Sequence, residues 1–296
     1  TIGTLTSPTY FRAVVKSGAC AEDNSSSVLV SINPLPTLTG AAQASTVCAG
    51  SGATISLSGM LANTTHTVAY SINGVAQTAI SGIVSNASGQ ASFTSAALTA
   101  ANNGQVLRIT GLTITSATPN CFQSFTRDVT LSVNPLPTLT GASQAATVCE
   151  GSAATINLSG MLASRTHTVS YTINGVAQAP IAGVGSDASG AASFTTPVLT
   201  AANNGQILQV TGLTITSATP NCSQTFTRNV TLSVSAATAG GTITGGSTPL
   251  CYGVTTGTLT LSGHTGTVQK WQKQLNSGGW TDISNTSTTY SEIPTS

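Results

Sequence analysis

Apolar and polar residues alternate along most of this chain with the two-residue period of β-strands. Clear examples are residues 53–58, 67–72, 106–109 and 129–133. Successive side chains of a strand point to opposite faces, so each stretch predicts a strand with one buried face and one exposed face. No stretch sustains the 3.6-residue period of an amphipathic helix, and the one helical candidate is a single turn within residues 98–103.

Turn residues divide these stretches into short strands. Asn73-Gly74 and Asn174-Gly175 each separate two apolar runs, and Asn-Gly suits a two-residue hairpin because both turn positions need a positive φ. Residues 87–89 and 102–104 give further turn signals. About seven short strands per 100 residues predict an all-β fold of tandem immunoglobulin-like β-sandwich modules in an extended linear array.

An internal repeat sets the predicted domain organisation. Residues 34–134 and 135–235 align at an offset of 101 residues with 26 differences, so 75 of 101 positions are identical. A repeat of this length indicates an array of whole domains rather than a solenoid of small units. We expect 34–134 and 135–235 to be two complete Ig-like modules.

The two ends resemble parts of the same kind of module. Residues 1–33 align with the C-terminal part of a repeat, and residues 236–296 align with the N-terminal part of a further one. The ends contain both Trp and all Lys of the chain, whereas the middle pair has neither. The sequence therefore predicts two module types within a longer repetitive protein.

Two aromatic residues in these end segments match landmarks of immunoglobulin domains. Trp271 falls in the expected third strand, and Tyr10 falls near the start of a stretch resembling the sixth strand. We expect both side chains to belong to the structural core.

Six cysteines recur at intervals of 28, 73, 28, 73 and 29 residues: Cys20, Cys48, Cys121, Cys149, Cys222 and Cys251. An even number at regular spacing indicates disulfides and an oxidising compartment. A zinc site is disfavoured, because no CxxC pair occurs and no His follows the ligand spacing.

Three arrangements of these cysteines are open. Pairing within each module gives Cys48–Cys121 and Cys149–Cys222, with the partners of Cys20 and Cys251 outside this chain. Pairing across neighbouring modules gives Cys20–Cys48, Cys121–Cys149 and Cys222–Cys251. We favour the first, because a disulfide needs Cα atoms within roughly 7 Å and the last hairpin of one module should lie far from the next module. Buried free thiols are the third alternative.

The scarcity of charge excludes several classes of function. Charged residues make up 5% of the 296 residues, and the formal net charge is +1. A nucleic-acid partner is disfavoured because no basic field is present. No apolar run approaches the ~18 residues of a membrane span, and no targeting segment is visible at the N-terminus.

We find no catalytic constellation, no cofactor motif and no metal-ligand pattern in the sequence. No two carboxylates of the middle modules lie close in sequence, and no GxSxG elbow is present. His66 and His167 recur at the same place before a strand, and we read them as surface or edge residues rather than general bases. The sequence therefore predicts a protein that is not an enzyme.

Several phrases of this sequence resemble those of a known repeat class. They are residues 147–151, 258–263, 280–283 with 287–290, and 10–15 followed by Gly18-Ala19-Cys20. Together they resemble the tandem Ig-like and PKD-like repeats of giant secreted cell-surface proteins of Bacteroidota, such as the gliding-motility adhesins of flavobacteria. The resemblance implies a cell-surface or extracellular location, export by the type IX route, and no catalytic residue.

Three functions follow as hypotheses. The first is a structural stalk or fibre segment of a large surface adhesin, used in attachment or gliding. The second is a module that binds surface glycans or another partner, with the module type that contains Trp as the favoured candidate. The third is a spacer in a large secreted enzyme. Other copies of the same fibre are also candidate partners, since near-zero charge opposes lateral association only weakly.

Overall fold

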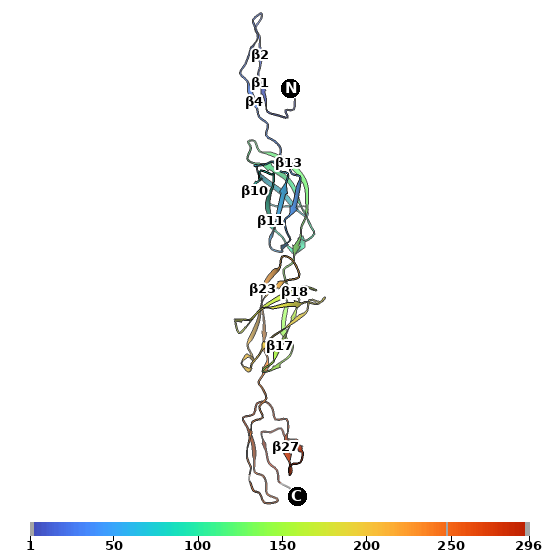
Figure 1. Ribbon diagram of the computed structural model, residues 1–296, viewed down its shortest axis with the longest axis vertical. Coiled ribbons are helices and arrows are strands. Elements are labelled where there is room, and N and C mark those ends of the chain that lie inside the picture. The colour runs from blue at the N-terminus through green and yellow to red at the C-terminus, as the bar shows by residue number, and fades with distance from the viewer. Residues whose placement is uncertain (1–2, 247, 294–296) are drawn as a thin grey trace. The chain divides into compact units, whose positions relative to one another are not determined.

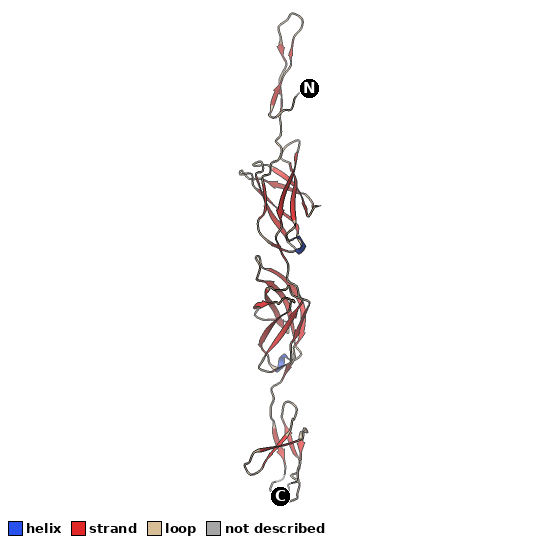
Figure 2. Cartoon of the chain, turned by 90° about the vertical axis from the view of Figure 1, so that its right-hand side faces the viewer, coloured by secondary structure: helices blue, strands red, loops and turns tan. Residues whose placement is uncertain are grey.

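A computed structural model describes residues 3–246 and 248–293 of the chain. The chain divides into two compact units, and each unit combines one repeat, complete in the first unit and nearly complete in the second, with one end of the chain. The first unit contains Thr1–Leu136 and Ala218–Cys222, and the second contains Pro137–Ser217 and Ser223–Ser296. Almost all regular structure is β-strand, with one short 3-10 turn in each repeat (Figure 2).

The first repeat is a two-layered sandwich, drawn from blue to green in Figure 1. One sheet has the strand order β11-β7-β5, and the other has the order β10-β8-β12-β13 with β9 paired to β8. A short parallel pair, β6 with β14, closes one end. The elements are β5 (Gly40–Gln43), β6 (Val47–Cys48), β7 (Gly52–Ser58), β8 (Thr65–Ile72), β9 (Val75–Ala76), β10 (Ile80–Val84), β11 (Ala91–Ala97), η1 (Ala100–Asn102), β12 (Val106–Ile114), β13 (Cys121–Thr130) and β14 (Val133–Asn134).

This strand order is that of an immunoglobulin-like sandwich. In the usual lettering, β11-β7-β5 corresponds to E-B-A, and β10-β8-β12-β13 corresponds to C′-C-F-G. All sheet pairings are antiparallel apart from the parallel contact between the end of the first strand and the end of the last. The predicted all-β, immunoglobulin-like sandwich is therefore confirmed.

The second repeat has the same elements 101 residues later. Its sheets have the orders β15-β17-β21 and β19-β18-β22-β23, with β20 on β18 and the parallel pair β16 with β24. The elements are β15 (Gly141–Gln144), β16 (Val148–Cys149), β17 (Ala153–Ser159), β18 (Thr166–Ile173), β19 (Val176–Ala177), β20 (Ile181–Gly185), β21 (Ala192–Val198), η2 (Ala201–Asn203), β22 (Ile207–Ile215), β23 (Cys222–Thr231) and β24 (Val234–Ser235).

The end segments contain fewer and shorter strands. The N-terminal segment forms the antiparallel pairs β1-β4 and β2-β3, and the C-terminal one forms β25-β26-β29 and β27-β28. Their bounds are β1 (Thr9–Phe11), β2 (Val14–Val15), β3 (Asp23–Asn24), β4 (Val28–Val30), β25 (Thr242–Gly245), β26 (Leu259–Ser262), β27 (Trp271–Gln274), β28 (Trp280–Ile283) and β29 (Thr289–Tyr290). The division of the chain into four modules stays a prediction.

The core of each repeat follows the alternation in the sequence. In β7 the residues Ala53, Ile55 and Leu57 are buried and the residues between them are not. The facing sheet contributes the same kind of row, and Tyr70 of β8 packs on Phe93 of β11 with ring centroids 5.3 Å apart. Apolar burial at about 25 cal/mol per Å² is the main stabilising term for such a sandwich.

The predicted turns are present. Asn73 and Gly74 both have positive φ, 48° and 79°, and they connect β8 to β9 as a two-residue hairpin. This is the geometry of a type I′ turn, for which Asn-Gly is the preferred pair. The helical candidate is also confirmed as the single 3-10 turn η1.

One buried hydroxyl distinguishes the two repeats. Tyr70 Oη accepts a hydrogen bond of 2.8 Å from the N–H of Ala96. The residue at the equivalent position of the second repeat is Pro197, which has no N–H to donate. Within the described part of the chain, the buried Tyr171 Oη consequently has no hydrogen-bond partner, and burial raises the pKa of this phenol.

Phe substitutions at these two tyrosines should therefore differ in sign. Tyr70→Phe removes a made hydrogen bond and should destabilise its repeat by about 1 kcal/mol. Tyr171→Phe removes a buried polar atom without a partner and should be neutral or stabilising by up to about 1 kcal/mol. Hydrogen exchange read by mass spectrometry checks this, because peptides that contain the differing positions report each repeat separately. Equal losses of protection in the two variants would contradict it.

Candidate functional site

The most distinctive chemical feature of the chain is a disulfide between Cys48 and Cys222. Its two Cα atoms are 5.6 Å apart, and the cysteines are separated by 174 residues of sequence. Cys48 belongs to the first repeat, whereas Cys222 belongs to the second repeat by sequence. The five residues Ala218–Cys222 nevertheless form part of the first compact unit. The bond is therefore a covalent link between successive repeats.

The parallel pair of strands places Cys48 at the point where the chain leaves the first repeat. Val47 lies opposite Val133, and Cys48 lies opposite Asn134. The N–H of Ala49 donates to the carbonyl oxygen of Asn134 at 2.9 Å and completes the ladder. The disulfide-bonded cysteine of the first repeat thus lies beside the last residue of that repeat.

Asn134 also contacts the segment that contains the second cysteine. Its Nδ2 donates to the carbonyl oxygen of Pro220 at 3.2 Å. Cys222 is almost completely buried, and its Sγ lies 3.6 Å from the same carbonyl oxygen. One asparagine side chain therefore joins the segment before Cys222 to the end of the first repeat.

The favoured pairing of cysteines within each module is wrong. Cys48 bonds to Cys222, and the expected Cys48–Cys121 and Cys149–Cys222 disulfides are not formed. Cys121 begins β13, whereas Cys48 lies opposite Asn134, thirteen residues further along this strand and its continuation. At about 3.3 Å per residue the two cysteines are separated by roughly 40 Å, far beyond the reach of a disulfide.

Of the cysteines in the described residues, four carry free thiols. Cys121 is partly buried, and Cys20, Cys149 and Cys251 are exposed. The alternative set of pairs, Cys20–Cys48, Cys121–Cys149 and Cys222–Cys251, is wrong as well, since Cys48 and Cys222 are joined to each other.

The two aromatic landmarks have different environments. Trp271 is 7% exposed, and its Nε1 donates to the carbonyl oxygen of Ser287 at 2.9 Å. Its ring lies 5.6 Å from the ring of Tyr290. Tyr10, in contrast, is 70% exposed, so its expected place in the core is wrong. The β1-β4 pair that contains it has no second sheet packed on it in the described part of the chain.

The hairpin formed by β27 and β28 presents an exposed indole beside polar groups. Trp280 is 64% exposed and pairs with Gln274, whereas Asp282 pairs with Gln272 on the same ribbon. Asp282 accepts hydrogen bonds from Lys270 Nζ at 2.7 Å and from Gln272 Nε2 at 2.8 Å, and these two donors lower the pKa of its carboxyl. Trp280, Lys270 and Gln272 line a common hollow, which gives this ribbon both an apolar surface and hydrogen-bonding groups.

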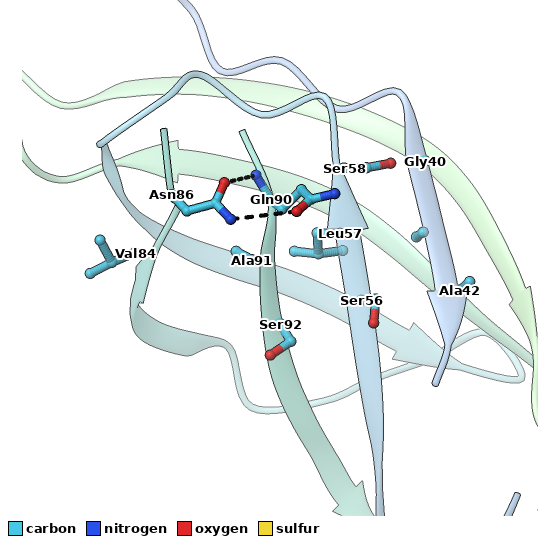
Figure 3. A pocket seen from close by; sticks show the side chains of 11 residues that line it. Gly40, Ala42, Ser56, Leu57, Ser58, Val84, Asn86, Gln90, Ala91 and Ser92 are labelled. Carbon is cyan, nitrogen blue, oxygen red and sulfur yellow. Dashed lines mark hydrogen bonds between the residues drawn. The ribbon is translucent and has the colours of Figure 1, made fainter. Parts of the chain in front are cut away.

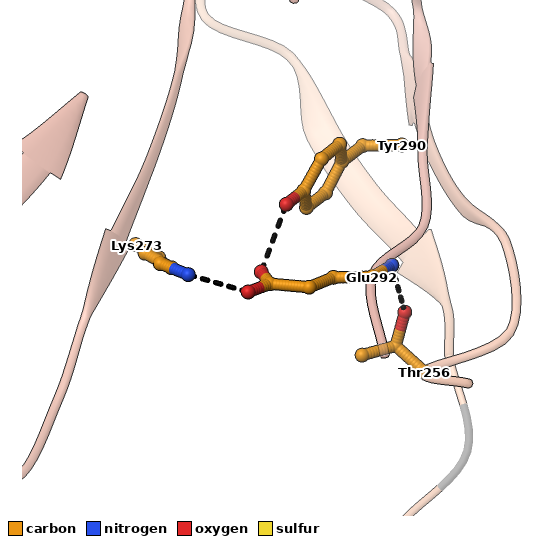
Figure 4. Close-up of polar contacts among 4 residues, drawn as sticks. All are labelled: Thr256, Lys273, Tyr290 and Glu292. Carbon is orange, nitrogen blue, oxygen red and sulfur yellow. Dashed lines mark hydrogen bonds and ion pairs between the residues drawn. The ribbon is translucent and has the colours of Figure 1, made fainter. Parts of the chain in front are cut away.

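A second polar cluster joins the last strand to the body of this segment (Figure 4). The Glu292 carboxylate accepts a hydrogen bond from Tyr290 Oη at 2.8 Å and forms an ion pair with Lys273. Its backbone N–H donates to Thr256 Oγ1 at 3.0 Å. The hydrogen bond from Lys273 lowers the pKa of Glu292, and the pKa of Lys273 rises for the same reason. Every group here has a protein partner, so the cluster is structural.

The outer face of β5, β7 and β11 carries a shallow hollow (Figure 3). Asn86 and Gln90 at its edge are bonded to each other: the N–H of Gln90 donates to Asn86 Oδ1 at 2.9 Å, and Asn86 Nδ2 lies 3.4 Å from Gln90 Oε1. The residues that line the hollow include neither an aromatic ring nor a charged group. It results from the small side chains of the strands, namely Gly40, Ala42, Ser56, Ser58 and Ser92.

The two repeated histidines lie in the interior, so their interpretation as surface or edge residues is wrong. His66 and His167 are both 0% exposed. His66 Nε2 lies 3.3 Å from Thr64 Oγ1, whereas the equivalent residue beside His167 is Arg165. Among the described residues, neither nitrogen of His167 has a hydrogen-bond partner. Burial lowers the pKa of both imidazoles and so favours their neutral form in the folded protein.

Metal-ligand groups and membrane-spanning helices are both absent from the described residues. These residues contain no group of three or more His, Cys, Asp or Glu side chains that could hold a metal ion. Among the same residues, no helix has the length and apolar character needed to cross a membrane.

The two ends of the chain match one family model, described as a domain of unknown function (DUF8696). The matched segments are residues 1–34 and 239–295. They amount to 34 and 57 residues, less than a third of the chain. No curated protein matches the chain.

Several solved structures align with most of the chain at low similarity. The D1–D4 ectodomain fragment of ICAM-5 aligns over 95% of this chain and 75% of its own, with 13% identity and a TM-score of 0.35. A marsupial T cell receptor aligns over 71% and 77%, with 12% identity and a TM-score of 0.36. The FN1–FN3 domains of chicken CNTN1 align over 74% and 75%, with 11% identity and a TM-score of 0.28. At these values the strand order described above, rather than any single alignment, identifies the fold.

The buried histidines should make stability depend on pH. Their pKa values are lowered in the folded state, so below about pH 6.5 the unfolded chain binds protons that the folded chain does not. The free energy of unfolding should therefore fall as the pH drops from 8 to 5.5, by at most about 1.4 kcal/mol per histidine for each pH unit below 6.5. Urea unfolding at a series of pH values measures this slope.

Apolar replacement of the histidines should flatten that dependence. His66→Leu and His167→Leu should each reduce the slope, and the double variant should remove most of it. His264→Leu is the matched control, because this side chain is only partly buried. An unchanged slope in the double variant would mean that the two histidines are not its source.

Proposed function

We propose that this chain is a non-catalytic structural segment, a stalk or spacer, of a large secreted protein. The observation that carries the proposal is the disulfide between Cys48 and Cys222, which joins successive repeats. A binding or catalytic module needs no such bond to its neighbour, whereas an element that transmits force along a chain benefits from one.

The position of the bond determines what it does to the covalent path. All residues between Cys48 and Cys222 lie inside a closed loop, and this loop contains most of both repeats. A pulling force along the chain passes through the sulfur–sulfur bond and bypasses the residues of the loop. In the loop-entropy picture, a closure of this length stabilises the folded state by at most about 5 kcal/mol.

The cellular setting is a further part of the proposal. A structural disulfide fits an oxidising, extracellular compartment. The resemblance to the repeats of Bacteroidota surface proteins supports a place at the cell surface, in an adhesin used for attachment or gliding. The partners that the proposal favours are other copies of the same fibre. In an alternative form of the proposal, the chain is a spacer in a large secreted enzyme whose catalytic residues lie in other domains.

Single-molecule pulling tests the mechanical role. With handles at the two ends, the oxidised chain should unfold to a contour length that excludes the loop. Cys222→Ser should lengthen the fully extended chain by on the order of 600 Å, because about 3.4 Å per residue is released over a separation of 174 residues.

Cys149→Ser is the matched control, since it removes an exposed free thiol and leaves the disulfide intact. It should leave the contour length unchanged, whereas a reducing agent should convert the unsubstituted chain to the behaviour of Cys222→Ser. Equal contour lengths for the oxidised chain and the Cys222→Ser variant would sink the proposal.

A second candidate function is the binding of a neutral glycan by the β27-β28 ribbon. The specific observation is Trp280, whose exposed indole adjoins a hollow shared with Lys270 and Gln272. A flat aromatic surface with hydrogen-bonding groups at its edge suits the apolar face and the hydroxyls of a sugar ring.

A glycan array probed with the whole chain tests this candidate. Trp280→Ala should weaken any binding by about tenfold or more, the loss expected for an aromatic stacking contact. Leu275→Ala is the control, because this residue is 74% exposed in the loop of the same hairpin and lies outside the hollow. Absence of binding, or binding that survives in Trp280→Ala, would remove this function.

A further inference from the structure

Two free cysteines occupy positions equivalent to those of the disulfide. Cys121 aligns with Cys222, and Cys149 aligns with Cys48, at the 101-residue offset of the repeats. Each can therefore be compared with the environment of a cysteine that is bonded in the same protein.

Cys121 reproduces the environment of Cys222. Asn33 Nδ2 donates to the carbonyl oxygen of Pro119 at 3.2 Å, as Asn134 Nδ2 donates to that of Pro220 at 3.2 Å. Cys121 Sγ lies 3.7 Å from the carbonyl oxygen of Pro119, against 3.6 Å for the bonded cysteine. The sulfur also lies 3.8 Å from the carbonyl oxygen of Asn33, so it faces the residue that precedes its own repeat.

Cys149 reproduces the environment of Cys48. It lies opposite Ser235 in the parallel pair of β16 with β24, as Cys48 lies opposite Asn134. The N–H of Glu150 donates to the carbonyl oxygen of Ser235 at 2.8 Å, close to the 2.9 Å of the equivalent bond from Ala49. Cys149 is exposed at the point where the chain leaves the second repeat.

We propose that Cys121 and Cys149 are two halves of the same inter-repeat disulfide site, and that each bonds to the complementary cysteine of an adjoining repeat. The cysteine before the second strand of each repeat pairs with the cysteine that begins the last strand of the following repeat. We call the cysteine before the second strand of a repeat its early cysteine and the cysteine that begins its last strand its hairpin cysteine. Cys149 bonds to the hairpin cysteine of a repeat that follows Ser235. Cys121 bonds to the early cysteine of a repeat that precedes Pro34. In a row of such repeats, every disulfide then joins one repeat to the next, and we call this arrangement staggered.

The chemistry is ordinary thiol oxidation. Two thiols lose two protons and two electrons as the sulfur–sulfur bond forms, and a disulfide such as oxidised glutathione accepts them and is reduced to two thiols. The exposed Cys149 is accessible for the exchange, and the contact of the adjoining repeat then buries the product as Cys222 is buried.

An added repeat tests the half-site at Cys149. A copy of residues 34–134 is inserted after Ser235, with Ser235→Asn to reproduce the junction that follows Val133. The copy keeps its hairpin cysteine and has Ser in place of its early cysteine, and Cys121→Ser in the original repeat makes the hairpin peptide unique. After oxidation with glutathione, digestion without reduction should yield Cys149 cross-linked to the inserted hairpin cysteine, together with the original Cys48–Cys222 link.

The converse insertion tests Cys121. A copy of residues 135–235, ending in Asn and with Ser in place of its hairpin cysteine, is inserted after Asn33 in a chain that carries Cys149→Ser. Cys121 should then be cross-linked to the early cysteine of the copy. In both chains the Cys48–Cys222 link shows that the original repeats have folded. A missing cross-link in either chain therefore counts against the half-site that this chain tests.

Alkylation under native conditions gives the second readout. Cys149 should react with iodoacetamide in the unextended chain and should be protected in the extended one. The proposal is overturned if Cys149 stays reactive while Cys48–Cys222 is formed, or if Cys149 is recovered bonded to Cys222. Protection of Cys149 without the predicted cross-linked peptide would also overturn it.

Discussion

The parallel contact between the first and last strands of each repeat determines where the chain leaves the sandwich. It consists of two residue pairs, Val133 with Val47 and Asn134 with Cys48. The Gln43 side chain strengthens it: its Nε2 donates to the carbonyl oxygen of Ser132 at 2.9 Å, and its Oε1 accepts from the N–H of Ser132 at 2.8 Å. A side-chain amide thus satisfies the backbone groups that an adjoining strand would satisfy. This contact holds Asn134 beside Cys48, so the chain that continues from Asn134 starts next to this cysteine, and the disulfide partner Cys222 lies in that chain.

Local pattern was sufficient to predict the strands but insufficient to predict the pairing of the cysteines. The alternation at Ala53, Ile55 and Leu57 and the Asn73-Gly74 turn are short-range signals, and the structure confirms both. The disulfide depends on which end of the sandwich each cysteine occupies. Cys48 follows the first strand, so it lies at the end where the chain departs, whereas the hairpin before Cys121 lies at the opposite end. That distinction requires the strand register. The strand predicted to begin at residue 67 begins at Thr65 in the structure, so His66 is its second residue and lies on the same buried face as Val68. The same holds for His167 in β18, and the alternation therefore extends to both histidines although their side chains are polar.

The two repeats also show how little the fold depends on surface charge. Arg108 and Asp128 form a bidentate ion pair across β12 and β13, with N–O distances of 2.6 and 2.8 Å. The same register in the second repeat holds Gln209 and Asn229, joined by a neutral hydrogen bond of 2.8 Å. The exchange leaves the element order of the sandwich unchanged. An exposed ion pair contributes at most about 1 kcal/mol, so a chain with few charges loses little stability from their absence.

Staggered disulfides have a consequence that bonds within each repeat would not have. A disulfide within a repeat protects only the residues of that repeat from a pulling force. The chain between two such repeats carries the full force. A bond from one repeat to the next closes a loop over parts of both, and successive loops overlap because Cys149 lies inside the loop closed by Cys48 and Cys222. Loss of one bond then leaves the shared repeat inside the neighbouring loop. Overlap of this kind requires each repeat to carry its two cysteines at opposite ends of the sandwich, and the roughly 40 Å between Cys48 and Cys121 meets that requirement.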